Sequence, residues 1–268
     1  YLAEHMAGKG LSLAVGLYVG GTAFGGMAGR VGTSVLAEWV SWREALAALS
    51  GLDLLVAFGF VCLLPRDERR PRPFSLHWPS HWQAWRRHLH HPTLPWLFVT
   101  GGLVMGVFVT VFNYVSFRLM RAPFFLSAAH IGLIFCAYVF GMVASPAAGA
   151  WADRIGRRPV MVAGLLVMTL GVLLTLAPSL VLVILGIVLV TIGFFVAHAV
   201  ASSWVGRRAA SHKGHAASLY LLAYYLGSSV LGSCGGWFWS HGGWPAVVGM
   251  TVTLLVLQLG LTRRLPAE

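Results

Sequence analysis

The sequence predicts an all-α, polytopic membrane protein with eight transmembrane helices. Of its 268 residues, 57% are hydrophobic and only 10% are charged, and the mean hydropathy is +0.76. Soluble domains carry about 25% charged residues. The apolar residues also come in runs close to the ~20 residues with which a helix crosses a hydrocarbon core of ~30 Å. These two observations exclude an ordinary soluble domain.

The first predicted span covers residues 11–36 and is dense in glycine. Overlapping G-x-x-x-G spacings leave one face without side chains, so that another helix can approach closely. Generic close packing accounts for most of this signal. The glycines of this pattern are Gly16, Gly20, Gly21, Gly25, Gly26 and Gly29.

The second predicted span, residues 43–64, places Asp53 at about mid-depth. A carboxyl group inside a membrane is costly and marks a candidate site for an ion or a proton. Asp53 is therefore a candidate for proton coupling.

Residues 65–95 form the longest segment between spans, and they are rich in arginine, proline and tryptophan. We interpret this segment as a basic cytoplasmic linker, within which residues 78–89 are amphipathic and lie on the membrane surface. The linker separates residues 1–64, the end of an N-terminal half, from residues 96–268, a C-terminal half of six helices.

Six further spans are predicted after the linker, at residues 96–117, 128–150, 159–177, 180–204, 216–238 and 245–261. Eight spans put both ends of the chain on one side. Of the 19 Lys and Arg residues, 15 fall on that side with the linker. The positive-inside rule therefore places both ends in the cytoplasm, and it explains the net charge of +11 without a nucleic-acid partner. The four basic residues on the other side are Arg30, Arg43, Arg118 and Arg121.

A charged segment, residues 149–158, joins the spans at 128–150 and 159–177. It reads G-x-x-x-D-R-x-G-R-R. Its ionic side chains cannot lie in hydrocarbon, so we expect a compact turn at the membrane surface. The residues that define it are Gly149, Asp153, Arg154, Gly156, Arg157 and Arg158.

An internal repeat relates the start of the chain to its end. At an offset of 202 residues, Tyr18 aligns with Tyr220 and Trp42 with Trp244. Four predicted spans precede the second copy within its half, so four are expected before the first copy as well. We therefore expect a twelve-helix fold of two halves, of which this chain carries helices 5–12 and lacks the first four.

The two halves, the basic linker and the charged turn together resemble the major facilitator superfamily of transporters. The glycine-dense first span is most similar to the fifth helix of bacterial sugar-efflux and drug-efflux members, although it lacks their proline. The resemblance implies a monomeric transporter of the bacterial inner membrane that exports a small molecule, sugar or drug-like, against protons by alternating access. Its partners are then the substrate, protons and the lipid bilayer. Uptake by the same fold is the alternative.

The resemblance also implies a gating role for the charged turn. Asp153 would cap the start of the first span, at residues 10–13 beside Lys9, when the cytoplasmic side is closed, because free N–H groups and the helix dipole favour an anion there. The alternative is that Asp153 only pairs with Arg154, Arg157 or Arg158 and fixes the turn. These arginines can also hold anionic lipid head groups.

Polar and aromatic residues within the spans are candidates for the wall of a substrate cavity. Asn113 is the sole asparagine of the chain, and an amide that faced lipid would be unsatisfied. Aromatic walls suit amphipathic substrates. A hydrogen-bonded packing role is the alternative for His198. The candidates are Asn113, Tyr114, Tyr138, Phe194, His198, Tyr220 and Tyr224.

Histidines of the linker raise the alternative of an enzyme. His77-x-x-x-His81 and His88-x-His90-His91 are similar to the histidine boxes of di-iron membrane desaturases. However, we expect Pro79 to break the helix that would align the first pair, the second box is one residue short, and there is no third box. The three cysteines also lack the spacing of metal ligands. We therefore expect no enzymatic activity, no cofactor and no metal site.

Overall fold

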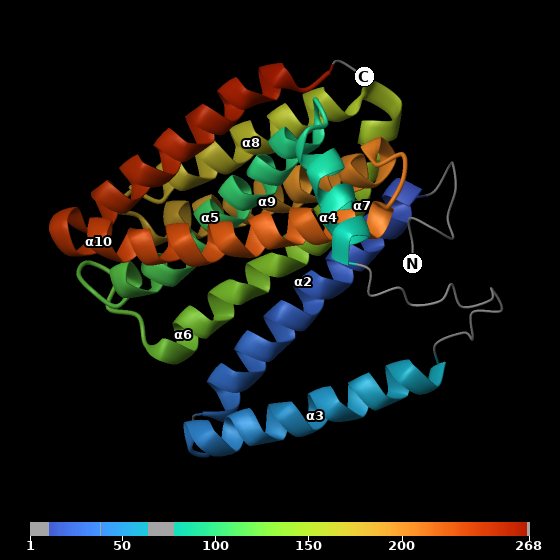
Figure 1. The fold of residues 1–268 in the computed structure, drawn as a ribbon. Coiled ribbons are helices and arrows are strands. Elements are labelled where there is room, and N and C mark those ends of the chain that lie inside the picture. Colours follow the sequence, from blue (N-terminus) through green and yellow to red (C-terminus); the bar gives the residue numbers. More distant parts are fainter. Residues whose placement is uncertain (1–10, 38, 64–77, 267–268) are drawn as a thin grey trace.

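The computed structural model describes residues 11–37, 39–63 and 78–266 (Figure 1). This part of the chain is helical and contains no strand, which confirms the all-α prediction. Short 3₁₀ segments, Ile134–Ala137 and Thr262–Arg264, follow α6 and α10. The α-helices are α2 (Leu11–Leu36), α3 (Trp42–Leu63), α4 (Trp78–Leu89), α5 (Leu94–Leu119), α6 (Ala128–Leu133), α7 (Tyr138–Ile155), α8 (Arg157–Leu174), α9 (Leu180–Arg208) and α10 (Lys213–Leu261).

Six segments of the described residues are long and apolar enough to cross a membrane. The helix α2 is not among them, although its 26 residues extend about 39 Å at the usual rise of an α-helix. The last of the six is 52 residues long and contains two of the predicted spans. The segments confirm a polytopic membrane protein, and they are Trp42–Leu63, Leu94–Leu119, His130–Ile155, Arg157–Leu174, Leu180–Arg208 and Lys213–Arg264.

The helix α10 changes direction at Gly243, between its two predicted spans. Gly243 has φ 61° and ψ −152°, a backbone conformation that glycine tolerates and other residues rarely adopt. The indole Nε1 of the buried Trp244 donates to the carbonyl oxygen of Thr175 at 3.0 Å, just after the end of α8. The reversal is therefore anchored to the α8–α9 connection, and the two arms of α10 run in different directions through the bundle (Figure 1).

The charged turn is shorter than the sequence predicts. The helix α7 continues to Ile155 and α8 begins at Arg157, so only Gly156 lies outside a helix. Gly156 has φ 95° and ψ 155°, where a side chain would be strained. The prediction of a compact turn over residues 149–158 was wrong in its extent, because one glycine is enough to redirect the chain.

Close backbone contacts hold the bundle together. The first arm of α10 lies along α5, α9 lies along α8, and α2 packs against α7 (Figure 1). Gly102 of α5 faces Gly227 of α10, and Gly171 of α8 faces Gly186 of α9. Because neither member of these pairs has a side chain, the backbones can touch.

Only some glycines of the α2 pattern pack against another helix. A Cβ on Gly20 would lie 3.3 Å from the carbonyl oxygen of Met142 on α7, and Gly26 lies against the ring of Tyr138. A packing role for Gly16 stays a prediction. Three other glycines of the pattern face open space in the described structure, namely Gly21, Gly25 and Gly29.

The helices α3 and α4 lie at the margins of the bundle. A capping box starts α3, in which Glu44 Oε2 accepts a hydrogen bond from the backbone N–H of Ser41 at 2.9 Å. Most residues of α3 are exposed, and Ala45 is its buried residue. The helix α4 has the bounds of the predicted amphipathic segment, and Pro79 lies in its first turn, where proline is tolerated. His77 lies outside the described residues, so the expectation that Pro79 keeps His77 and His81 from sharing one helix stays a prediction.

Candidate functional site

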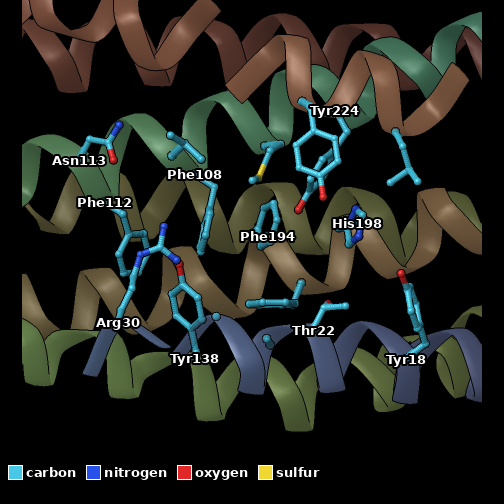
Figure 2. Close-up of a pocket in the computed structure, with 17 residues that line it drawn as sticks. Tyr18, Thr22, Arg30, Phe108, Phe112, Asn113, Tyr138, Phe194, His198 and Tyr224 are labelled. Atoms are coloured by element: carbon cyan, nitrogen blue, oxygen red, sulfur yellow. The ribbon is translucent and has the colours of Figure 1, made fainter. Parts of the chain in front are cut away.

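A cavity of about 310 Å³ lies between α2, α5, α7, α9 and the first arm of α10 (Figure 2). The helices α2, α5, α9 and α10 contribute residues at helical spacing, so one stripe of each faces the cavity, and α7 contributes Tyr138. On α2 the stripe includes every fourth residue from Tyr18 to Arg30, namely Tyr18, Thr22, Gly26 and Arg30. The other lining residues include Met105, Phe108, Val109, Phe112 and Asn113 of α5, Tyr138 of α7, Phe194, Phe195 and His198 of α9, and Leu221, Tyr224 and Tyr225 of α10.

Aromatic rings form much of the cavity wall. Phe108 of α5 stacks on Phe194 of α9 with ring centroids 4.0 Å apart, and Phe194 lies parallel to the ring of His198 at 5.7 Å. Phe112 and Tyr138 meet edge to face at 5.3 Å. Such a wall offers flat apolar faces to a ligand that carries a ring.

Five of the seven predicted cavity residues line this space, and two do not. The hydroxyl of Tyr114 donates to the carbonyl oxygen of Gly232 at 3.0 Å, between α5 and α10. Tyr220 is buried, and its hydroxyl lies 2.9 Å from Nδ1 of His198. His198 thus borders the cavity and also has the hydrogen-bonded packing role that was its alternative. Substrate binding stays a prediction for the five lining residues, Asn113, Tyr138, Phe194, His198 and Tyr224.

Arg30 is the charged residue of the cavity that was not predicted from the sequence, as Tyr18, Thr22 and Phe108 were not. It was counted only among the four basic residues on the non-cytoplasmic side, whereas it borders the cavity beside Tyr138 (Figure 2). Its Cζ atom lies 5.1 Å from the centroid of the Phe135 ring, within the range of a cation–π contact. The spacing of four residues from Tyr18 through Thr22 to Arg30 is the signal that could have found it.

Asp153 connects three helix ends. Its Oδ1 accepts hydrogen bonds from Nη2 of Arg157, which begins α8, and from Nη2 of Arg207, near the end of α9, each at 2.9 Å. The first pair corresponds to the alternative of a charge-fixed turn, and Arg207 is a partner that the sequence did not indicate. Lys9 and Gly10, at the helix start that Asp153 is predicted to cap, lie outside the described residues. Capping by Asp153 therefore stays a prediction. The other residues of the motif lie on the same two helices, Gly149 and Arg154 on α7 and Arg158 on α8.

Asp53 lies on α3 and does not line the cavity. Its side chain is exposed, on a helix that is itself largely exposed. Proton coupling by Asp53 stays a prediction.

Histidines of α4 and of the α9–α10 connection form a cluster beside the bundle. His81 Nδ1 and His215 Nε2 lie 2.8 Å apart with their rings stacked, so one ring donates to the other. His88 Nε2 lies 3.2 Å from the carbonyl oxygen of His212. Burial lowers the pKa of His88 and of His215, and the neighbouring imidazoles lower that of His215 further. Within the described residues no group of three or more His, Cys, Asp or Glu side chains could hold a metal ion, and His77 of the first histidine box lies outside them.

Comparison with known proteins places this architecture among transporters. A sequence profile of the Major Facilitator Superfamily matches residues 119–266. The chain is 44% identical over 265 residues to the "Inner membrane transport protein YnfM" of Escherichia coli, with 99% of the chain and 63% of that relative covered.

Two further relatives extend this similarity to other bacteria. One is the "Uncharacterized MFS-type transporter YybF" of Bacillus subtilis, 38% identical over 262 residues with 98% of the chain and 65% of the relative covered. The other is an "Uncharacterized transporter" of Buchnera aphidicola, 37% identical over 265 residues with 99% and 64% covered. The chain therefore spans somewhat less than two thirds of the length of the relatives it matches.

Proposed function

The chain belongs to the major facilitator superfamily, and on this premise we propose that the protein is a secondary active transporter, not an enzyme, that moves a small molecule across the bacterial inner membrane. Secondary transporters bind their substrate near the middle of the membrane and open the site to the two sides in turn. The observation that carries the proposal is the position of the aromatic cavity. Phe108 is the fifteenth of the 26 residues of α5, and Phe194 is the fifteenth of the 29 residues of α9, so the cavity lies near the middle of both helices.

Efflux driven by protons is the mode of transport that we propose. The glycine-dense sequence of α2, similar to that of efflux transporters, supports the direction. His198 supports the coupling, because an imidazole can accept and release a proton and this one borders the cavity beside the hydroxyl of Tyr220. The ion pairs of Asp153 with Arg157 and Arg207 support a gate at the cytoplasmic ends of α7, α8 and α9.

Proton flux in vesicles with an imposed pH gradient tests this function. Arabinose, ethidium and 2-naphthoate serve as probes of sugar, cationic and anionic chemistry. At least one of them is expected to dissipate the gradient only in vesicles that contain the protein. Ala23→Trp should abolish the effect, because Ala23 is a buried lining residue and an indole there fills the cavity.

Leu182→Trp is the matched control, since it adds the same indole to an exposed position of α9 outside the cavity. It is expected to leave proton flux unchanged. Flux that survives Ala23→Trp would show that the cavity is not the transport path. Flux that appears in right-side-out vesicles under an inward proton gradient, with accumulation of the probe, would establish uptake in place of efflux.

A further inference from the structure

The cavity wall contains one fixed charge, and that charge is positive. Among the 17 lining residues Arg30 is the only Lys, Arg, Asp or Glu side chain. No carboxylate therefore borders the cavity in the described part of the chain. A wall of this kind repels a cationic ligand and attracts an anionic one.

Arg30 has no anionic partner among the described residues. Its guanidinium lies over the ring of Phe135 at 5.1 Å, and Nη1 approaches the position of a Cβ on Gly26 at 3.8 Å. A ring face attracts a cation only weakly in comparison with a carboxylate. A charge within a membrane helix is costly unless it is paired or solvated, and such charges mark functional sites.

The polar groups of the cavity are separated by its aromatic wall. Figure 2 shows Arg30 and Asn113 toward one end of the view and Tyr18 and His198 toward the other. The rings of Phe108 and Phe194 lie between these ends in the view, and the ring of Phe112 lies beside Arg30, 4.6 Å from that of Phe108. An amide and a guanidinium both donate hydrogen bonds, so their end of the cavity is suited to an acceptor.

We propose that the cavity binds an aromatic monocarboxylate, with the carboxylate at Arg30 and Asn113 and the ring against Phe108, Phe112 and Phe194. The inference rests on the proposed transport function and names its substrate class. At the packing density of protein interiors, a cavity of about 310 Å³ holds roughly a dozen non-hydrogen atoms. A bicyclic aromatic acid has this size, and guanidinium groups bind carboxylates with matched, bidentate geometry.

Three probes that share one ring system test the charge preference. The purified full chain is tested by equilibrium dialysis against radiolabelled 2-naphthoate, 2-naphthamide and 2-naphthylmethylammonium. The anion is expected to bind most tightly and the cation least. Arg30→Gln should weaken binding of 2-naphthoate roughly 30-fold, the loss typical of one hydrogen bond to a charged group, and should change binding of the neutral amide less than about threefold. Retained amide binding also shows that the variant is folded.

Two further variants make the test specific. Arg30→Lys keeps the charge and should retain most of the preference for the anion. Arg43→Gln removes a charge from the neighbouring helix α3, but Arg43 lies over Trp42 at 4.5 Å and outside the cavity, so anion binding should be unchanged.

Stronger binding of the cation than of the anion would overturn the inference, and so would anion binding that Arg30→Gln leaves unchanged. Absence of binding by all three probes would overturn it as well. None of these results touches the transport function, because proton flux with arabinose or ethidium is an independent measurement.

Discussion

Asp153 uses one carboxylate oxygen to hold two arginines from different helices. Arg157 is only 7% exposed, so its guanidinium depends on this partner more than a surface arginine would. Arg207 brings the end of α9 to the same oxygen. The residue therefore stabilises the meeting point of α7, α8 and α9 whether or not it also caps α2.

Asp153→Asn is expected to lower the free energy of unfolding by about 1–2 kcal/mol, because a neutral amide is a weaker acceptor than a carboxylate for the guanidinium groups of Arg157 and Arg207. Denaturant unfolding of the protein in detergent measures this loss. Arg154→Gln is the control, since Arg154 is exposed in the same segment and outside both ion pairs. Its effect should stay below about 0.5 kcal/mol. Equal stability of the two variants would show that the ion pairs contribute nothing.

Gly156 is the single residue that separates α7 from α8, and its φ of 95° explains why it is glycine. Gly156→Ala is expected to cost about 1–3 kcal/mol of stability, because alanine is strained in this region of φ and ψ. Gly214→Ala provides the matched comparison, since Gly214 lies in the first turn of α10 with open space at its Cβ position. That substitution should be neutral or slightly stabilising. Similar losses for both variants in the same unfolding experiment would contradict the account of Gly156.

At the scale of elements, α4 is held to the start of α10 by contacts between histidines. The His81–His215 contact requires at least one neutral imidazole, because two protonated rings at 2.8 Å would repel each other. Burial is the main cause that lowers the pKa of His88, His91 and His215, and Arg208 and the neighbouring histidines contribute. The bound position of α4 is therefore favoured at neutral pH.

Release of α4 is expected as the pH falls below about 6.5, the ordinary pKa of histidine. The sign follows from the lowered pKa values, since a group that binds its proton more readily in the released state favours that state in acid. Spin labels at Gln83→Cys and Ser218→Cys, both exposed, report the distance between α4 and α10. The distance should lengthen between pH 7.5 and 5.5, and His81→Gln combined with His215→Gln should reduce the change. An unchanged distance would contradict this role of the histidines.

Sequence patterns predicted the bounds of a helix correctly where the pattern lies within one stretch of sequence. The bounds of α2 and α4 coincide with the predicted segments, because a glycine-rich apolar run and an amphipathic segment are each visible within one stretch of sequence. The patterns failed at Gly156, because charged residues predict the membrane surface but not whether the helix continues through them.

At the scale of the whole molecule, the cavity could be predicted only in part. Asn113, Phe194 and His198 stand out because polar or aromatic residues within a span attract attention one at a time. Tyr220 satisfies the same criterion, yet it does not line the cavity and instead forms a hydrogen bond with His198. Which of these two roles it has depends on the rotation of α9 and α10 about their axes. Arg30 was missed because the positive-inside rule assigned it only a side of the membrane, and its place in the cavity depends on the face of α2 that it shares with Tyr18 and Thr22.

Five helices surround the cavity, and we propose that it is a transport site that opens to each side of the membrane in turn. Thr22 lines it on α2, near the middle of that helix. A cysteine at this position would lie on the cavity wall, where a charged reagent that enters the cavity can reach it. Cys62, Cys136 and Cys234 are exposed and are first replaced by serine.

Labelling of Thr22→Cys by a membrane-impermeant maleimide, in inside-out and in right-side-out vesicles, tests this claim most directly. Ser179→Cys and Ser211→Cys, in the connections at opposite ends of α9, are controls that should each react from one side only. If the cavity opens to each side in turn, Thr22→Cys is expected to react from both sides, and Ala23→Trp is expected to slow both reactions. Reaction from one side alone under all conditions would contradict alternating access through this cavity.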